Sequence, residues 1–340
     1  MNILVTGGTG YIGSHTTVEL IKKGYRPILV DNLSNSHEGV VKQLEKITGK
    51  AIDFYNIDLC DRTALSKLLD TIKIDAVIHF AAFKSVGDSV KNPLSYYRNN
   101  LLSLLNLSDE CIRRGISRLV FSSSCTVYGN PETLPVKESD PAASPNSPYG
   151  QTKLIGENIL RDAAQAHGIR CISLRDFNPA GSHESGLIGE NSLDTPNNLV
   201  PVITRTAAGK IDKLTVFGND YATPDGTCIR DYIHVCDVAK AHVNALERLE
   251  SSANNPAFEA FNLGTGKGSS VMEVIRAFEK ISGMNLNYEI GPRRAGDVEK
   301  IWADPSLANQ TLGWKPEYSL DDMVRSAWAY EQQLQTINAD

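Results

Sequence analysis

A glycine-rich turn between two short apolar runs constrains the fold of this chain more than any other stretch. The first 33 residues read MNILVTGGTGYIGSHTTVELIKKGYRPILVDNL: an apolar run at residues 3–5, the turn, a helical stretch and a second apolar run at 28–30. Runs so short and rich in branched side chains suit strands buried on both faces of a parallel sheet. The order strand, helix, strand predicts a βαβ unit and an α/β fold.

The glycines of this turn are Gly7, Gly10 and Gly13, in the pattern G-x-x-G-x-x-G. Gly7 permits a tight turn, Gly10 lets a pyrophosphate approach the backbone, and Gly13 lets the helix pack close to the strand. Free N–H groups and the helix dipole favour an anion there. Asp31 follows about 20 residues on, where a carboxylate accepts from ribose hydroxyls and repels a 2′-phosphate. The turn therefore predicts a site for NAD rather than NADP.

Strand and helix patterns alternate beyond this unit. We expect helices at 40–47, 63–72, 93–115, 149–167, 235–249 and 271–281, strands at 51–57, 75–80, 118–121 and 258–263, and a loop at 129–148. The side chains expected on the inner side of the helix at 93–115 are Leu101, Leu104, Leu105 and Cys111. This alternation predicts a Rossmann-type, doubly wound parallel sheet with right-handed crossovers.

Small residues at the end of the strand at 75–80 indicate a ligand crevice. Ala81 and Ala82 leave room at the carboxyl end of a parallel strand, which is where such sheets bind ligands. Lys84, just beyond, would reach a phosphate or a ribose, although a solvated surface lysine is the more common interpretation of an isolated lysine.

A serine, a tyrosine and a lysine form the candidate catalytic group. Tyr149 and Lys153 are four residues apart at the start of a predicted helix, so they share one face. A lysine ammonium beside a phenol stabilises the phenolate and favours general base catalysis. Ser124 ends a strand of the same sheet and would bind a substrate oxygen beside Tyr149. Taken alone, the Tyr/Lys pair is more often a structural surface pair.

These three residues after a glycine-rich βαβ unit resemble the short-chain dehydrogenase/reductase superfamily, in its extended branch. Within that branch the chain resembles the UDP-glucose 4-epimerase (UDP-galactose 4-epimerase) family. The similar stretches include TGGTGYIGSHT, VDNLSNS, VIHFAAFKSVGDSV, FSSSCTVYG, SPYGQTK, FNPAGSH, NNLVP, VFGNDYATPDGTCIRDYIHV and PRRAGD, and they span nearly the whole chain. Together they are far more specific than any one motif.

The resemblance implies an isomerase of galactose metabolism that inverts carbon 4 of a UDP-hexose. In this family Tyr149, activated by Lys153 and assisted by Ser124, would remove the proton of the sugar 4-hydroxyl while hydride passes to bound NAD. The 4-keto sugar would rotate and take the hydride back on its opposite face. Because NAD is regenerated, it should stay tightly bound. The resemblance also implies a homodimer, formed through the helices at 93–115 and 149–167.

The resemblance further assigns residues to the two ligands. The cofactor-contacting residues that it implies are Gly7, Gly10, Tyr11, Ile12, Gly13, Asp31, Asn32, Asn35, Ser36, Asp58, Leu59, Phe80, Ala81, Ala82, Lys84, Asn99, Ser122, Tyr149, Lys153 and Phe177. The substrate-contacting residues are Lys84, Ser124, Tyr149, Asn178, Asn198, Leu199, Val216, Phe217, Arg230, Tyr232, Arg293, Asp297 and Ile301. The arginines would bind the diphosphate, since guanidinium groups match phosphate oxygens, and Asp297 would bind the uridine ribose.

Two domains are expected. Residues 1–175 with part of 230–265 would form the NAD-binding Rossmann domain, and residues 176–230 with 265–340 a smaller α/β domain for the UDP-sugar. A net charge of −6 without a basic run argues against nucleic acid as a partner. No stretch reads as a signal peptide or a bilayer span, so we expect a cytoplasmic protein without a membrane partner. The six cysteines lack metal-type spacing, so we expect reduced thiols and no metal.

Three other functions fit parts of the pattern. Nucleotide-sugar 4,6-dehydratases and decarboxylases of the same scaffold need an acid within two residues of the strand-end serine, whereas this chain has Cys125 and Thr126. A non-catalytic NAD-sensing protein would tolerate loss of the Tyr/Lys pair, which is intact. A UDP-N-acetylglucosamine 4-epimerase, or an enzyme that accepts both kinds of sugar, remains the main alternative.

The chain departs from the family pattern at two positions. Asp176 precedes Phe-Asn-Pro, where relatives usually carry an aromatic residue. A carboxylate near the nicotinamide would favour NAD⁺ over NADH unless Arg175 or solvent neutralises it. Ile301 stands where relatives restricted to glucose and galactose often carry a bulky aromatic residue and where those that admit N-acetyl sugars carry a small one. Isoleucine is intermediate and stiff, and core packing would also explain it.

Overall fold

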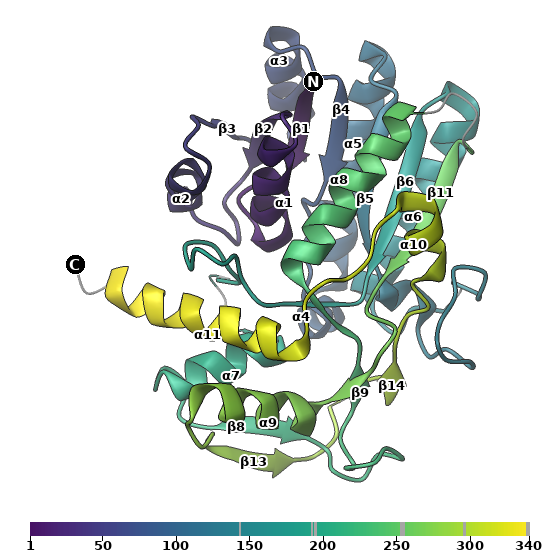
Figure 1. Ribbon diagram of the computed structural model, residues 1–340. Helices are drawn as coiled ribbons and strands as arrows, with labels where there is room; N and C mark the ends of the chain where they lie inside the picture. Colours follow the sequence, from purple (N-terminus) through teal and green to yellow (C-terminus); the bar gives the residue numbers. More distant parts are fainter. Residues whose placement is uncertain (143, 192, 194–195, 252–255, 295–296, 338–340) are drawn as a thin grey trace.

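A seven-stranded parallel sheet forms the centre of the computed structural model (Figure 1). The structure describes residues 1–142, 144–191, 193, 196–251, 256–294 and 297–337. The strands are β1 (Asn2–Thr6), β2 (Arg26–Asp31), β3 (Asp53–Asn56), β4 (Ala76–His79), β5 (Arg118–Ser124), β6 (Arg170–Asp176) and β11 (Phe258–Leu263). Their order is β11-β6-β5-β4-β1-β2-β3, and every neighbouring pair is parallel. The expected doubly wound fold is confirmed.

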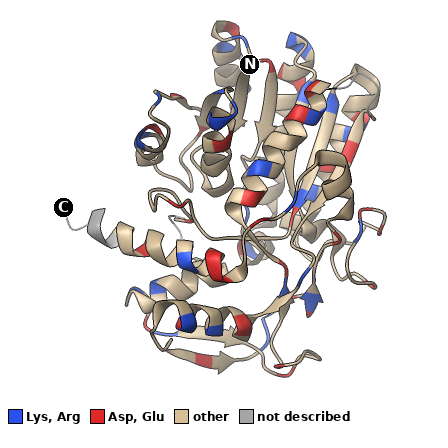
Figure 2. Ribbon diagram, in the orientation of Figure 1, with Lys and Arg blue, Asp and Glu red and all other residues tan. Residues whose placement is uncertain are grey.

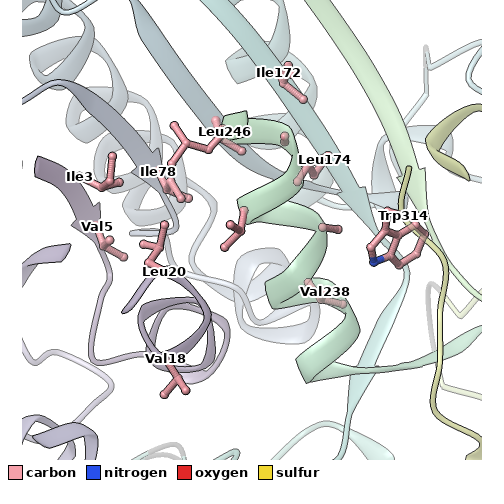
Figure 3. Packing of buried hydrophobic residues seen from close by; sticks show 14 of the residues in the cluster. Ile3, Val5, Val18, Leu20, Ile78, Ile172, Leu174, Val238, Leu246 and Trp314 are labelled. Carbon is pink, nitrogen blue, oxygen red and sulfur yellow. The ribbon is translucent and has the colours of Figure 1, made fainter. Parts of the chain in front are cut away.

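Helices cover both faces of this sheet. One face carries α1 (Tyr11–Lys22), α2 (Gly39–Thr48) and α8 (Val235–Ser251), and the other carries α3 (Arg62–Thr71), α5 (Pro93–Arg114) and α6 (Pro148–His167). On the α8 face, Val238 and Leu246 pack in the same cluster as Ile78 and Leu174 of the sheet (Figure 3). On the other face Leu104 and Leu160 join the second cluster. Apolar strands buried from both sides are what the run at residues 3–5 predicted.

Helix α5 faces the core differently from the prediction. Leu104 and Cys111 are fully buried, as expected, but Leu105 is 45% exposed. Successive residues of a helix are about 100° apart around its axis, so a face that buries Leu104 turns Leu105 outward. The prediction that Leu105 lies on the inner side was wrong. A short helix that the sequence analysis did not predict, α4 (Val86–Lys91), lies directly before α5.

Smaller sheets and further helices build a second region around a separate core. The strands are β7 (Asn178–Ala180), β8 (Leu214–Phe217), β9 (Ile229–Arg230), β10 (Tyr232–His234), β12 (Ser269–Ser270), β13 (Tyr288–Gly291) and β14 (Lys300–Ile301), and the helices are α7 (Leu199–Ala207), α9 (Val271–Ser282) and α11 (Leu320–Ile337). Val200, Val274 and Val324 bring the three helices into one cluster. This region lies below the carboxyl ends of the central strands in Figure 1.

The chain passes between the two regions more than once. After β14 it returns to the first core, where Ala308 and Leu312 of α10 (Ser306–Leu312) pack with Trp314 on the α8 side of the sheet. Trp314 donates through its Nε1 to the carbonyl of Asp237 on α8 at 2.8 Å. Acidic and basic residues alternate along the helices and do not gather in one stripe (Figure 2). Within the described ranges, the helices are all too short or too polar to span a bilayer.

Candidate active site

The glycine turn is as tight as its sequence predicts. Gly7 has a φ of +70°, and a Cβ at Gly7 would lie 2.8 Å from the Ala81 nitrogen. A Cβ at Gly13 would lie 2.2 Å from the Gly7 carbonyl oxygen, far inside contact distance. Only glycine at position 13 lets α1 begin against the turn. The predicted tight turn at Gly7 and the predicted close packing of the helix at Gly13 are therefore both confirmed.

The residues around the turn fit a dinucleotide. Gly10 is the N-cap of α1 and has no side chain to cap the helix, so the first N–H groups of α1 remain for an anion. Asp31 lies at the carboxyl end of β2, beside the turn. Its Oδ2 accepts from the Thr9 backbone at 3.2 Å, and its Oδ1 accepts from the Leu33 backbone at 3.0 Å and from the Ser36 hydroxyl at 3.2 Å. The carboxylate thus holds the loop that would surround the adenosine ribose.

Other residues expected at the cofactor also gather near this edge of the sheet. Asn32 donates to Asp58 at 3.2 Å. The Tyr11 hydroxyl donates to the Gly181 carbonyl at 2.6 Å. The Asn35 side chain accepts from the Leu193 backbone at 3.2 Å. The segment after β7 therefore crosses back onto residues that are expected at the cofactor.

Lys84 and Asn198 share one carboxylate. Lys84 Nζ lies 2.6 Å from Glu190 Oε1, and the Asn198 side-chain amide donates to the same oxygen at 2.7 Å. Glu190 thereby joins a residue expected at the cofactor to one expected at the substrate. Glu190 is not among the residues predicted from the sequence, although it lies between the matching stretches FNPAGSH and NNLVP.

The candidate catalytic residues converge from β5 and α6. Strand β5 runs through all three serines, and Ser124 Oγ accepts from the Thr126 backbone at 3.3 Å. Tyr149 lies in the first turn of α6, which Ser147 caps by accepting from the Gly150 backbone at 3.1 Å. Lys153 follows one turn later, with Nζ 5.8 Å from the centre of the Tyr149 ring. The two residues are neighbours on one helix face, as predicted.

Burial shapes the protonation of this group. It raises the pKa of Tyr149 well above the ordinary value for a phenol, and the hydrogen bond with Ser124 acts in the opposite direction. Burial also lowers the pKa of Lys153 to about 8, although the carboxylates of Asp176 and Glu157 favour its ammonium form. A buried phenol of raised pKa becomes a base only when positive charge stabilises its phenolate, and the Lys153 ammonium supplies such a charge.

Arg175 and Asp176 point to different partners. The Arg175 guanidinium pairs with Glu157 at 2.7 Å and donates to the Tyr128 hydroxyl at 2.7 Å. Asp176 Oδ2 accepts from the Ser122 hydroxyl at 2.9 Å. Since successive strand residues face opposite sides of a sheet, Arg175 is engaged elsewhere and forms no ion pair with Asp176. The bond between Asp176 and Ser122 was not predicted from the sequence. The separation of Arg175 from Asp176 was predictable, because side chains alternate between the two faces along β6.

Two arginines expected at the substrate, Arg230 and Arg293, and the adjacent Arg294 are paired with carboxylates. Asp297 Oδ1 lies 3.6 Å from an Arg230 nitrogen and 2.7 Å from an Arg294 nitrogen. Arg293 pairs with Asp220 at 2.8 Å, and its guanidinium carbon lies 4.1 Å from the centre of the Tyr221 ring. Two residues of PRRAGD, at positions 295 and 296, lie outside the described residues. The end of β9 and the segment after β13 therefore carry these cationic groups, and their binding to a diphosphate stays a prediction.

The remaining expected residues differ in exposure. Side chains that are buried are Ser122, Leu59, Phe177, Val216, Tyr232 and Ile301, while those at least partly exposed are Ile12, Asn99, Phe80, Asn178, Leu199 and Phe217. Val216 and Tyr232 belong to the separate core of the second region, and Ile301 packs with Cys125 and Phe177. Their assignment to ligand contact stays a prediction.

Comparisons with known proteins give relatives of nearly the same length. Residues 4–327 match the family model described as GDP-mannose 4,6 dehydratase. A UDP-glucose 4-epimerase of Dictyostelium discoideum is 51% identical, over 97% of this chain and 95% of that protein. One from Bacillus subtilis is 49% identical, over 97% of both chains.

Solved structures agree with these sequence relatives. The UDP-glucose 4-epimerase of Stenotrophomonas maltophila, with bound NAD and formylated UDP-arabinopyranose, matches with a TM-score of 0.95 and 46% identity, over 99% of both chains. The enzyme from Bifidobacterium longum, in complex with NAD⁺ and UDP, matches with a TM-score of 0.94 and 44% identity, over 98% of both chains. The likeness extends over both regions of the molecule.

Proposed function

Since this chain belongs to the UDP-glucose 4-epimerase family, we propose that Ser124, Tyr149 and Lys153 carry out the chemistry. It is an NAD-dependent isomerase that reversibly inverts carbon 4 of a UDP-hexose. The observation that supports the assignment is the convergence of the three residues: Lys153 Nζ lies 5.8 Å from the Tyr149 ring, and Tyr149 shares a hydrogen bond with Ser124.

Each of the three residues has one task. Bound NAD would supply reversible hydride transfer at carbon 4 of the sugar. Tyr149 accepts the proton of the 4-hydroxyl as that oxygen becomes a carbonyl, and it gives the proton back when the hydroxyl is restored. Ser124 binds the same oxygen and keeps it in line with Tyr149. Lys153, anchored by donating to the Ser122 carbonyl at 2.6 Å, stabilises the phenolate.

Arg230 and Arg293 would bind the diphosphate of the substrate. In the structure their charges are offset by Asp297 and Asp220. An arriving diphosphate would replace or join these carboxylates, because guanidinium groups bind phosphate oxygens in two-point geometry. Asp297 would then be released toward the uridine ribose.

We also infer a homodimer. Exposed apolar side chains gather on α4 and α5, namely Val86, Val90, Leu94, Leu102 and Leu105. Leu94, Leu102 and Leu105 fall within about 80° of one another around α5, so they form one stripe. A stripe of this kind on neighbouring helices suits burial against a second copy of the same surface.

A cytoplasmic location in galactose metabolism completes the proposal. All six cysteines are free, and five of them are buried, which suits a reducing compartment. The substrate range includes UDP-galactose and UDP-glucose. Acceptance of UDP-N-acetylhexosamines as well is favoured by Ile301, which is smaller than an aromatic residue at the same place.

Replacing Tyr149 tests the assignment. Tyr149→Phe removes the proton acceptor while it preserves the ring, so the conversion of UDP-galactose to UDP-glucose should fall by at least about 100-fold. Tyr288→Phe, on the exposed strand β13, is the matched control and should retain the parent rate. Near-normal conversion by Tyr149→Phe would reject the role of Tyr149. A dehydratase would instead release a 4-keto-6-deoxy sugar, which mass spectrometry of the product distinguishes.

A further inference from the structure

Asp176 is a buried carboxylate that the steps described above do not use. It ends β6, is 5% exposed, and pairs in register with Ser124 at the end of β5. Its Oδ2 accepts from the Ser122 hydroxyl at 2.9 Å. Its Oδ1 is buried and has no hydrogen-bond partner among the described residues. A buried oxygen left without a partner is costly, so Asp176 has a reason to be kept other than protein stability.

Ser122 links Asp176 to Lys153. The hydroxyl of Ser122 donates to Asp176, and the carbonyl of Ser122 accepts from Lys153 Nζ at 2.6 Å. One residue of β5 therefore holds both the carboxylate and the ammonium at the catalytic end of the strand. Arg175, the neighbour that would have neutralised Asp176, is held by Glu157 instead. The carboxylate of Asp176 lies close enough to Lys153 and Tyr149 to raise the pKa of both side chains.

The other titratable groups around Asp176 are accounted for. Helix α6 contributes Tyr149, Lys153 and Glu157, of which Glu157 is engaged by Arg175. Two buried histidines, His242 of α8 and His79 of β4, lie near Lys153, and burial lowers their pKa values to about 4 and about 3. The turn after β5 contributes Cys125, whose pKa burial raises to about 12. Strand β11 places the apolar Leu263 beside Asp176. Lys153 is therefore the nearby charge that acts on Asp176.

We propose that Asp176, held by Ser122 and facing Lys153, biases the site toward the oxidised form of its nicotinamide cofactor. The inference rests on the proposed function, which brings the nicotinamide to the group formed by Tyr149 and Lys153. An oxidised nicotinamide ring carries a positive charge and the reduced ring does not, so a carboxylate in a water-poor site stabilises the oxidised form. Asp176 acts by its charge and is a positioning residue.

This bias depends on pH in a defined direction. Burial raises the pKa of Asp176 to about 7, while the Ser122 hydrogen bond and Lys153 act against the rise. Below that pH the side chain is a neutral acid and exerts little preference. Above it the carboxylate forms, and the preference for the oxidised cofactor appears. Asp176→Asn mimics the neutral acid at every pH.

A cofactor competition measures the bias without relying on turnover. Each holoprotein is equilibrated with an equimolar mixture of NAD and NADH and freed of excess. In the released cofactor, absorbance near about 340 nm measures NADH and the adenine absorbance measures the total of both forms. In the parent, the bound ratio of NADH to NAD should fall as the pH rises through about 7. In Asp176→Asn the fall through about pH 7 should be absent, leaving only the change as Lys153 loses its charge near about pH 8, and the ratio should exceed that of the parent by about three- to tenfold at the alkaline end.

Two further variants make the test specific. Asp237→Asn is the matched control, because Asp237 is also buried, has an unpartnered Oδ1 and has a pKa raised by burial to about 6, yet lies on α8 against the 317–318 backbone. It should follow the parent at every pH. Ser122→Ala removes the bond that favours the carboxylate, so the pH of the change should move upward.

The inference is overturned if the bound ratio of NADH to NAD depends on pH in the same way in the parent and in Asp176→Asn. It is also overturned if Asp237→Asn changes this ratio as much as Asp176→Asn does. If Asp176→Asn does not fold, the inference is overturned when the ratio in Ser122→Ala changes at the same pH as in the parent. Conversion of UDP-galactose by the same parent samples is assayed separately. If the parent converts UDP-galactose but its NADH to NAD ratio does not depend on pH, the role of Asp176 is rejected. If the ratio depends on pH but the parent does not convert UDP-galactose, the proposed function is rejected.

Discussion

At the scale of single residues, the site is governed by which buried groups hold charge. Glu157 and Arg175 form a buried ion pair, and the Ser123 and Ser173 hydroxyls donate to Glu157. These contacts offset the cost of removing the two charges from water. Lys153 has no such carboxylate within bonding distance and donates to a carbonyl. Within the described part of the chain, no direct ion pair therefore cancels its charge, which acts on Asp176 and remains available to stabilise the Tyr149 phenolate.

Removing that charge should change the pH dependence of the rate. Because burial lowers the pKa of Lys153 to about 8, the parent carries the ammonium below that pH and loses it above. We expect the kcat of the parent to decline as the pH rises through about 8. Lys153→Met should lack this decline and lose at least about tenfold in kcat near neutral pH. Lys280→Met, which removes an exposed surface lysine, should reproduce the profile of the parent.

The size of residue 301 should set the preference between sugars. Ile301 is 4% exposed and packs with Cys125 and Phe177. Ile301→Ala should raise the ratio of kcat/KM for UDP-N-acetylgalactosamine to that for UDP-galactose, because it removes volume beside the candidate substrate site. Parallel assays of both substrates measure the ratio. An unchanged ratio would assign Ile301 to core packing alone.

At the scale of elements, the site is built where strands end and helices begin. Strands β1, β4, β5 and β6 deliver the turn, Ala81, Ser124 and Asp176 to one edge of the sheet, as parallel strands must. Helices α1 and α6 start at that same edge. The close fit of α1 to the turn is the contact on which this arrangement depends most.

A methyl group at position 13 should disrupt that contact. In Gly13→Ala the new Cβ would lie 2.2 Å from the Gly7 carbonyl, so α1 must shift away from the turn. We expect loss of most bound NAD, measured as cofactor released per protein chain after gel filtration. Gly39→Ala, at the first position of α2 with open space around it, is the matched control and should keep the parent NAD content.

At the scale of the whole molecule, the exposed stripe on α4 and α5 predicts the state of assembly. Leu105→Glu places a charge in the stripe, and the proposed dimer should dissociate to a monomer because a buried unpaired charge is costly. Sedimentation velocity measures the change. Leu307→Glu, on an exposed position of α10, should sediment like the parent. A parent that already sediments as a monomer would contradict the proposed homodimer.

The order of strands and helices through the first half of the chain, the NAD turn and the place of the catalytic residues on their elements follow from the sequence alone. The reason is that these features are local. Hydrophobic periodicity decides helix or strand, the glycines at 7 and 13 satisfy backbone constraints within one turn, and Tyr149 and Lys153 are neighbours on any helix.

Only the tertiary structure decided which distant groups meet. Ser122 and Asp176 are 54 residues apart, and they bond because β5 and β6 are neighbours in a particular register. Glu190 joins Lys84 to Asn198 because the chain crosses back over the sheet edge. Leu105 turns outward because α5 packs through Leu104. Each outcome depends on which elements become neighbours, and periodicity within a single element carries no information about that.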